Sequence, residues 1–420
     1  MELEYQLDEI PPKKVLIALS LQWFAIIAAI LIIGGRIVAE IQFENPADRI
    51  GYIQKIFLIS GITMLAQLFI GHRLPLVVGP ASVLIAGIYA SMGSDFSTIY
   101  TAIAIGGVVI FFFGITGSLN LLRKLFTENI VAVVLILVAI TLSPLIMEMI
   151  TLDTPNAGYN FAFSILFVIM LFILNKKLRG FWNSSLILWS LILGSAVYSL
   201  IFPQHYEILN PDPLNVFSEI NITLSFRLEV IISFMICFFA LAINDLSSIY
   251  SLAGTLKLED TEFRAKRGVT LTGLSNILSG FFGVIGSVNY SMSPGIISAT
   301  KCASRYALVP AGFILLILAF TPFVISLIEA IPKVVIGSVF LYIMCSQVAV
   351  GIPMIKFKDT ASGFVIGFPL LLSILVTFLP ESVLTSFPEI LRPIIGNGFV
   401  LGVLVAMLME HVILRRDYEN

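Results

Sequence analysis

The chain has 420 residues, of which 58% are hydrophobic and only 12% are charged, whereas soluble domains carry about 25% charged residues. A mean hydropathy of +1.02 is too high for a surface that faces water, so the composition predicts an all-α polytopic membrane protein. The formal net charge of −2 excludes the strongly basic composition of a nucleic-acid-binding protein.

The apolar segments predict fourteen spans. The first follows an acidic N-terminus without the basic n-region of a signal peptide, so we expect a retained span. The polar segment 203–226 is interpreted as a linker between spans 1–7 (residues 1–202) and spans 8–14 (residues 227–420). The spans are predicted at 14–35, 51–71, 74–92, 98–119, 129–150, 159–175, 181–202, 227–253, 266–284, 287–301, 305–329, 333–352, 359–380 and 388–412.

Two of these spans are interrupted. Gly79 and Pro80 break the third span, and the short tenth span contains Pro294 and Gly295. Proline removes a backbone donor and clashes with the preceding turn, so neither segment can be one regular helix. Paired breaks at corresponding positions predict a 7+7 inverted repeat with a binding site at the breaks. The alternative is a pair of kinked structural helices.

The distribution of basic residues predicts the orientation. With the N-terminus inside, 18 of the 24 Lys and Arg residues fall on the inner face. Because cytoplasmic loops carry the excess of Lys and Arg, we expect both termini in the cytoplasm and the chain in the plasma (inner) membrane.

Asp245 is the deepest carboxylate in the predicted spans. An Asp near the centre of a span costs about 2.5–3.5 kcal/mol on insertion scales and usually has a function. Asp245 could exchange a proton, hold Na⁺ or bind a donor on a substrate, so we expect H⁺ or Na⁺ as the coupling ion. The structural alternative is that Asn244, Ser247 and Ser248 satisfy it within a packed bundle.

The breaks supply further candidate binding groups. Half-helix N-termini expose backbone N–H groups with partial positive charge, which can bind a polar ligand. The predicted substrate-binding residues are therefore those around the two breaks, with Asn244 beside the carboxylate and Gln22 in the first span. They are Ala81, Ser82, Met292, Ser293, Gly295, Asn244, Asp245 and Gln22. Met292 could instead be a packing residue.

Other classes of membrane protein fit less well. His72, His205 and His411 lie at span ends or in loops, and no His or Cys cluster has metal-like spacing. We therefore expect no enzyme, metal or cofactor. A channel would need a continuous polar stripe through several spans, and the sequence contains only isolated polar positions.

The chain resembles the nucleobase–ascorbate transporter family, which includes bacterial uracil and xanthine permeases, most strongly from Asp245 to Ile352. Three positions of the family's tenth-span signature are matched in this sequence, by Gly295, Thr300 and Lys301. The other similar motifs are Leu19-Ser20-Leu21-Gln22, Leu74-Pro75 with Gly79-Pro80-Ala81-Ser82, Leu274-Ser275 with Ser279-Gly280-Phe281-Phe282-Gly283, Ser304-Arg305, and Ile331-Pro332 with Val335 and Gly337.

The resemblance implies a secondary transporter, with a core part that has short strands at the two breaks, a gate part, and a homodimer. It places the family's base-binding carboxylate on Asp245. It also places Met292 and Ser293 where the family has Gln or Glu followed by Asn, Ile249 where uracil permeases have a histidine, and Ser82 where the family has a base-stacking aromatic residue.

These observations predict a cation symporter of a nucleobase or a related small planar solute. The alternative is an anion transporter of the related sulfate or bicarbonate families, which share the architecture and use half-helix N-termini as anion sites. The lack of a second carboxylate at Met292 agrees with that alternative.

Overall fold

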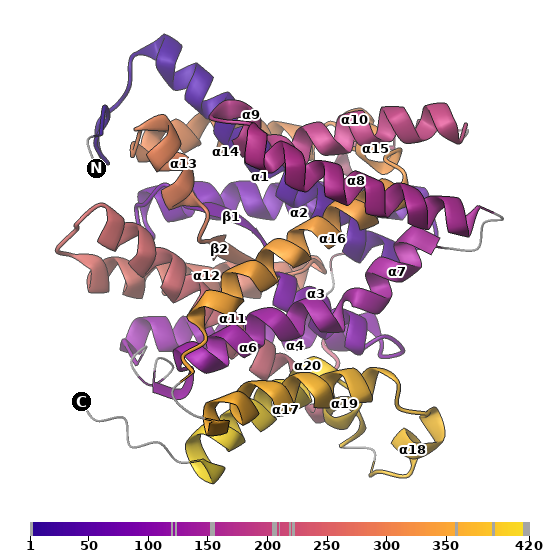
Figure 1. Cartoon of the computed structure of the whole chain (residues 1–420). Helices are drawn as coiled ribbons and strands as arrows, with labels where there is room; N and C mark the ends of the chain where they lie inside the picture. The colour runs from indigo at the N-terminus through magenta and orange to yellow at the C-terminus, as the bar shows by residue number, and fades with distance from the viewer. Residues whose placement is uncertain are drawn as a thin grey trace.

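The computed structural model describes residues 3–414 apart from 119–120, 122–123, 152–155, 204–207, 210, 218–219, 221–222, 358–359 and 389–390. The described chain is mostly helical (Figure 1). The elements are α1 (Lys13–Gln42), α2 (Pro46–Phe69), β1 (Val77–Pro80), α3 (Ser82–Ala90), α4 (Phe96–Thr116), α6 (Glu128–Thr141), α7 (Ser143–Thr151), α8 (Ala157–Lys177), α9 (Phe181–Ser184), α10 (Leu186–Ile201), η1 (Pro213–Phe217), α11 (Leu228–Thr255), α12 (Thr261–Phe282), β2 (Ser287–Tyr290), α13 (Ser293–Thr300), η2 (Arg305–Leu308), α14 (Val309–Ala319), α15 (Pro322–Glu329), α16 (Lys333–Gly351), η3 (Ile352–Met354), α17 (Thr360–Thr377), α18 (Glu381–Thr385), α19 (Arg392–Ile395), α20 (Gly398–Leu408) and η4 (Met409–Ile413).

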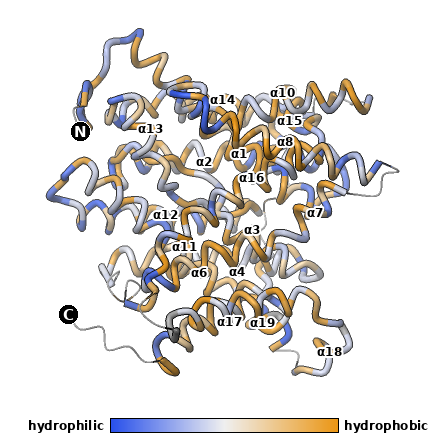
Figure 2. Tube along the Cα trace, viewed as in Figure 1, coloured by the Kyte–Doolittle hydropathy of each residue, from blue (hydrophilic) through white to orange (hydrophobic). Residues whose placement is uncertain are grey.

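Several of these helices can cross a bilayer. Within the described residues, seven spans are long and apolar enough, or eight if the pair η2–α14 and α15, bent by 88°, is one span. Thr321 and Pro322 lie at this bend, where proline cannot continue the preceding helix. Hydrophobic residues run along the helices, and hydrophilic residues gather at the turns on the left and right edges of Figure 2. The chain is therefore a multi-pass membrane protein.

The two interrupted segments meet as a short antiparallel sheet. Val77 pairs with Tyr290 and Pro80 pairs with Ser287. Gly79 is needed here because a Cβ at this position would come within 2.9 Å of Ile30 and 3.1 Å of Tyr290. The sheet satisfies backbone groups that the breaks would otherwise leave unpaired inside the protein.

The described helices form two groups around this sheet. The first, which we call the strand group, contains α1–α4 and α11–α15, with α4 packed along α12 and α2 along α14. The second, which we call the α16 group, contains α6–α10 and α16–α20, with α16 packed on α6, α7, α8 and α10. The groups touch where α1 meets α10 and α16, and where α3 and α11 meet α6 and α20.

The predicted linker 203–226 contains a short element of its own. In its described part, η1 packs against α2, and the Leu209 N–H donates to the Ser326 hydroxyl at 2.9 Å. The segment therefore lies on the strand group where it is described.

Candidate functional site

A cavity of about 520 Å³ lies between the sheet and α16. Ligand sites in proteins are mostly apolar pockets of about 300–1,000 Å³ with a few polar groups. The walls come from both helix groups: α1, α3, α11 and the two strand ends on one side, and α6, α10 and α16 on the other. A solute in this cavity would contact both groups at once.

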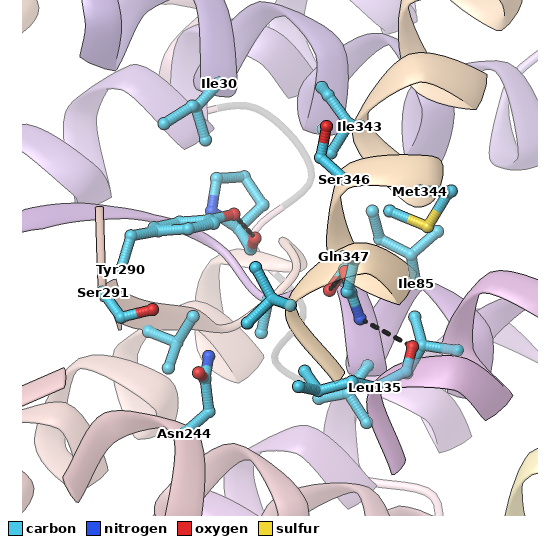
Figure 3. Close-up of a pocket in the computed structure, with 18 of the residues that line it drawn as sticks. Ile30, Ile85, Leu135, Asn244, Tyr290, Ser291, Ile343, Met344, Ser346 and Gln347 are labelled. Carbon is cyan, nitrogen blue, oxygen red and sulfur yellow. Dashed lines mark hydrogen bonds between the residues drawn. The ribbon is translucent and has the colours of Figure 1, made fainter. Parts of the chain in front are cut away.

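The polar lining is small and uncharged. Asn244, Tyr290 and Ser291 belong to the strand group, and Ser346 and Gln347 lie opposite on α16 (Figure 3). The Tyr290 hydroxyl donates to the Pro80 carbonyl oxygen, so its ring lies across the end of β1. Among the described residues that line the cavity, none is Asp, Glu, Lys, Arg or His.

The predicted site residues divide into two sets. Ala81, Ser82, Asn244 and Met292 line the cavity. The other four do not line it, and the side chains of Ser293 and Gln22 make hydrogen bonds elsewhere in the fold. Ser293 is buried and accepts a hydrogen bond from the Val77 N–H at 3.3 Å, the Gln22 amide donates to Ser184 at 3.4 Å, and Gly295 has open space around it; the fourth is Asp245.

Asp245 points away from the cavity lining and toward β2. Its side chain is fully buried, and Oδ1 accepts hydrogen bonds from the Asn289 backbone N–H at 3.0 Å and from Asn289 Nδ2 at 2.7 Å. Oδ2 has no partner among the described residues. The neighbouring Ser248 hydroxyl donates to the Asn289 carbonyl at 2.9 Å. The helix α11 thus holds β2 through both the side chain and the backbone of Asn289.

The polar contacts of Asp245 continue to α2 and α12. His72 Nδ1 accepts from the Leu74 N–H at 2.9 Å, so a neutral ring carries its proton on Nε2, which lies 3.1 Å from Asn289 Oδ1. Gln67 donates to Thr272 Oγ1 at 3.1 Å and accepts from the His72 N–H at 3.3 Å. We call Asp245, Asn289, His72, Gln67 and Thr272 the Asp245 network. It joins four elements of the strand group.

Among the described residues, five polar residues of the cavity lining were not among the sequence predictions: Tyr290, Ser291, Gln347, Ser346 and Ser251. Tyr290 and Ser291 immediately precede Met292, so extending the predicted break toward the N-terminus by two residues would have included them. Gln347 is an isolated amide in the apolar helix α16. The signal that could have found it is the cost of placing an amide in the hydrocarbon region.

A protein-family model, Xan_ur_permease, described as a permease family, matches residues 14–382. CPE0397 of Clostridium perfringens, which bears the name of a purine permease, is 26% identical over 96% of this chain and 90% of its own. The uric acid permease PucJ of Bacillus subtilis is 22% identical over 88% of this chain and 86% of its own.

Solved structures show the same fold. The transmembrane domain of the cyanobacterial bicarbonate transporter BicA aligns with a TM-score of 0.58 over 96% of this chain and 98% of that domain, at 16% identity. At this identity the likeness concerns the fold alone. The family match covers most of the chain, and the apolar helices make it a multi-pass membrane protein. The chain therefore belongs to this permease family, whose members are membrane transporters and not enzymes.

Proposed function

We propose that this chain is a secondary active transporter that carries a nucleobase together with a cation, H⁺ or Na⁺. The observation that carries the proposal is the uncharged cavity between the two strand ends and α16, with the buried Asp245 beside the cavity-lining Asn244. The names of the purine and uric acid permeases related to this chain support a planar heterocyclic substrate.

The finer architecture follows the family pattern. We propose fourteen spans, with the strand group as the core part and the α16 group as the gate part. The halves 1–202 and 227–420 would form inverted repeats, each with one strand followed by a half-helix. The antiparallel pairing of β1 with β2 supports this symmetry. A homodimer in the plasma (inner) membrane, with both termini cytoplasmic, completes the proposal.

Asp245 is proposed as the coupling residue. A carboxyl group that is fully buried with one oxygen unpartnered can take up a proton or lie against a bound cation. Because Asp245 contacts β2 and β2 ends at the cavity, a change in its charge can reach the substrate through Asn289 and Tyr290. The anion carrier is less well supported, since none of the described residues that line the cavity is basic.

Transport by the purified protein in proteoliposomes tests the proposal. Hypoxanthine, guanine, xanthine and uracil should be offered separately under an inward proton or sodium gradient. We expect at least one base to accumulate, and collapse of the coupling gradient to abolish that accumulation. Uptake of sulfate or bicarbonate without uptake of any base would overturn the proposal.

A further inference from the structure

The cavity contains two side-chain amides that come from opposite helix groups. Asn244 lies on α11, and its amide makes no hydrogen bond to the described part of the chain. Gln347 lies on α16, across the cavity in Figure 3. Its Oε1 accepts from the Ser82 hydroxyl at 3.4 Å and its Nε2 donates to the Leu135 carbonyl at 3.3 Å.

Both contacts of Gln347 are easily exchanged. Good hydrogen bonds of these kinds have donor–acceptor distances of about 2.5–3.2 Å, so the two distances at Gln347 indicate weak bonds. An amide held in this way can turn to a ligand at little cost. The bond to Ser82 also joins α16 directly to the start of α3, so a ligand that takes over Gln347 would replace one polar contact between the two helix groups.

The chemistry of the lining selects among ligands. Each side-chain amide offers an N–H₂ donor and a carbonyl acceptor, and Asn and Gln pair in two-point fashion with the donor and acceptor edges of bases. The backbone N–H groups of Ser82 and Val83, at the start of α3, precede the first intrahelical hydrogen bonds of that helix and suit the carbonyl oxygen of an oxopurine. An anion would lose its hydration without meeting a charged partner, because the part of the lining that the structure describes contains no Lys, Arg or His.

We infer that Gln347 is a specificity-determining residue which, with Asn244, recognises the uncharged form of an oxopurine, and that the site discriminates against the urate anion. The inference rests on the proposed nucleobase transport and deepens it. The two amides provide the hydrogen-bonding side chains that Met292, which has only a thioether, cannot provide.

Ligand binding to the detergent-solubilised protein tests the inference. Unlabelled hypoxanthine, which is neutral at pH 7, and urate, which is an anion at that pH, are each used to displace labelled hypoxanthine from the protein. We expect urate to bind at least tenfold more weakly than hypoxanthine at pH 7.5. Lowering the pH toward 5, where much of the urate becomes neutral uric acid, should reduce the difference in affinity between the two ligands. Equal affinity for both at pH 7.5 would overturn the inference.

Substitution at Gln347 provides the second arm. Gln347→Ala and Gln347→Leu should each weaken hypoxanthine binding at least tenfold while the melting temperature stays near that of the wild type. Cys345→Ala, two residues away on an exposed face of α16 outside the cavity, is the matched control and should bind as the wild type. If Gln347→Ala binds hypoxanthine as tightly as the wild type, Gln347 does not determine specificity and the inference is wrong. If the wild type binds no base at all, the proposed function itself fails.

Discussion

Asn289 donates two hydrogen bonds to Oδ1 of Asp245, one from its backbone N–H at 3.0 Å and one from Nδ2 at 2.7 Å. The contact connects the middle of α11 to the strand that ends at the cavity. It leaves Oδ2 of Asp245 buried and without a partner in the described chain. A carboxyl group in this position is structurally anchored and still has one oxygen free for a proton or a cation.

Asp245→Asn should separate the anchoring of β2 from the coupling to a proton or cation. The amide oxygen of Asn can still accept from the Asn289 N–H, so we expect a melting temperature within a few degrees of the wild type and retained base binding. The variant cannot exchange a proton and has no charge for Na⁺. Accumulation of the base in proteoliposomes should therefore lose its response to pH or sodium gradients.

A gradient response equal to the wild type in Asp245→Asn would remove Asp245 from the coupling mechanism. Measuring uptake with a proton gradient alone and then a sodium gradient alone identifies the ion that the wild type uses. Glu229→Gln on the same helix is the control, because Glu229 lies in the first turn of α11 beside Arg227 and should keep the coupling unchanged.

His72 contacts the side-chain oxygen of Asn289, whose side-chain nitrogen donates to Asp245. In His72→Leu, Asn289 Oδ1 loses its 3.1 Å contact with the imidazole inside the protein. An unsatisfied buried acceptor costs about 1–3 kcal/mol, so we expect a lower melting temperature and slower uptake. His72→Gln retains a donor and should recover most of the stability. Equal stability of His72→Leu and the wild type would show that this hydrogen bond contributes nothing.

A second polar cluster includes Arg36 on α1, the helix whose Ile33 and Gly34 line the cavity, and it bridges the two helix groups. Glu329 contacts Arg36 and bonds Arg49 Nε at 2.7 Å, and Glu40 contacts Lys333 at the start of α16. Arg36 is 4% exposed. In Glu329→Gln both arginines keep a longer contact with Glu40, at 3.4 Å from Arg36 and 3.6 Å from Arg49, so their charges are not left uncompensated. The loss is that of hydrogen bonds to a charged group, so Glu329→Gln should lower the free energy of unfolding by about 1.5–3 kcal/mol.

The exposed pair of Lys356 and Glu128, with side chains 61% and 57% exposed, is the matched control for Glu329→Gln. Exposed pairs contribute about 0–1 kcal/mol. Lys356→Ala should leave thermal unfolding in detergent nearly unchanged. If the two variants shift the melting temperature equally, the cluster around Glu329 is no stronger than an exposed pair.

The sequence predicts much of this architecture because hydrophobic length and proline position are local properties. The predicted break at Gly79 and Pro80 coincides with β1. Pro294 and Gly295, where the second break is predicted, instead lie in the first turn of α13, which begins at Ser293, because proline is tolerated at the start of a helix. The pairing of β1 with β2 brings together segments more than 200 residues apart, and hydropathy contains no information about such a contact. The family resemblance suggested the strands.

The candidate site was harder to predict for a geometric reason. Successive residues on a helix differ in direction by about 100° because a turn takes 3.6 residues. Asn244 therefore faces the cavity while Asp245 faces β2. The sequence identifies Asp245 as a deep carboxylate without giving the direction of its side chain. Gln347 lies across the cavity from Asn244 only because α16 packs against the strand group.

Close packing of α4 against α12 gives the last prediction. A Cβ on Gly107 would lie 2.6 Å from the Ile277 backbone nitrogen and 2.9 Å from the Gly273 carbonyl oxygen. These are backbone atoms of α12, which cannot move aside as a side chain can. Overpacking of this kind costs about 1–3 kcal/mol, so Gly107→Ala should lower the melting temperature in detergent. Gly367→Ala in α17 is the control, because a Cβ there meets no atom of the described residues within 4 Å. Since Ala is the better helix former by up to about 1 kcal/mol, Gly367→Ala should leave the melting temperature unchanged or raise it. If Gly107→Ala proves as stable as Gly367→Ala, α4 and α12 are separated by more than the structure indicates.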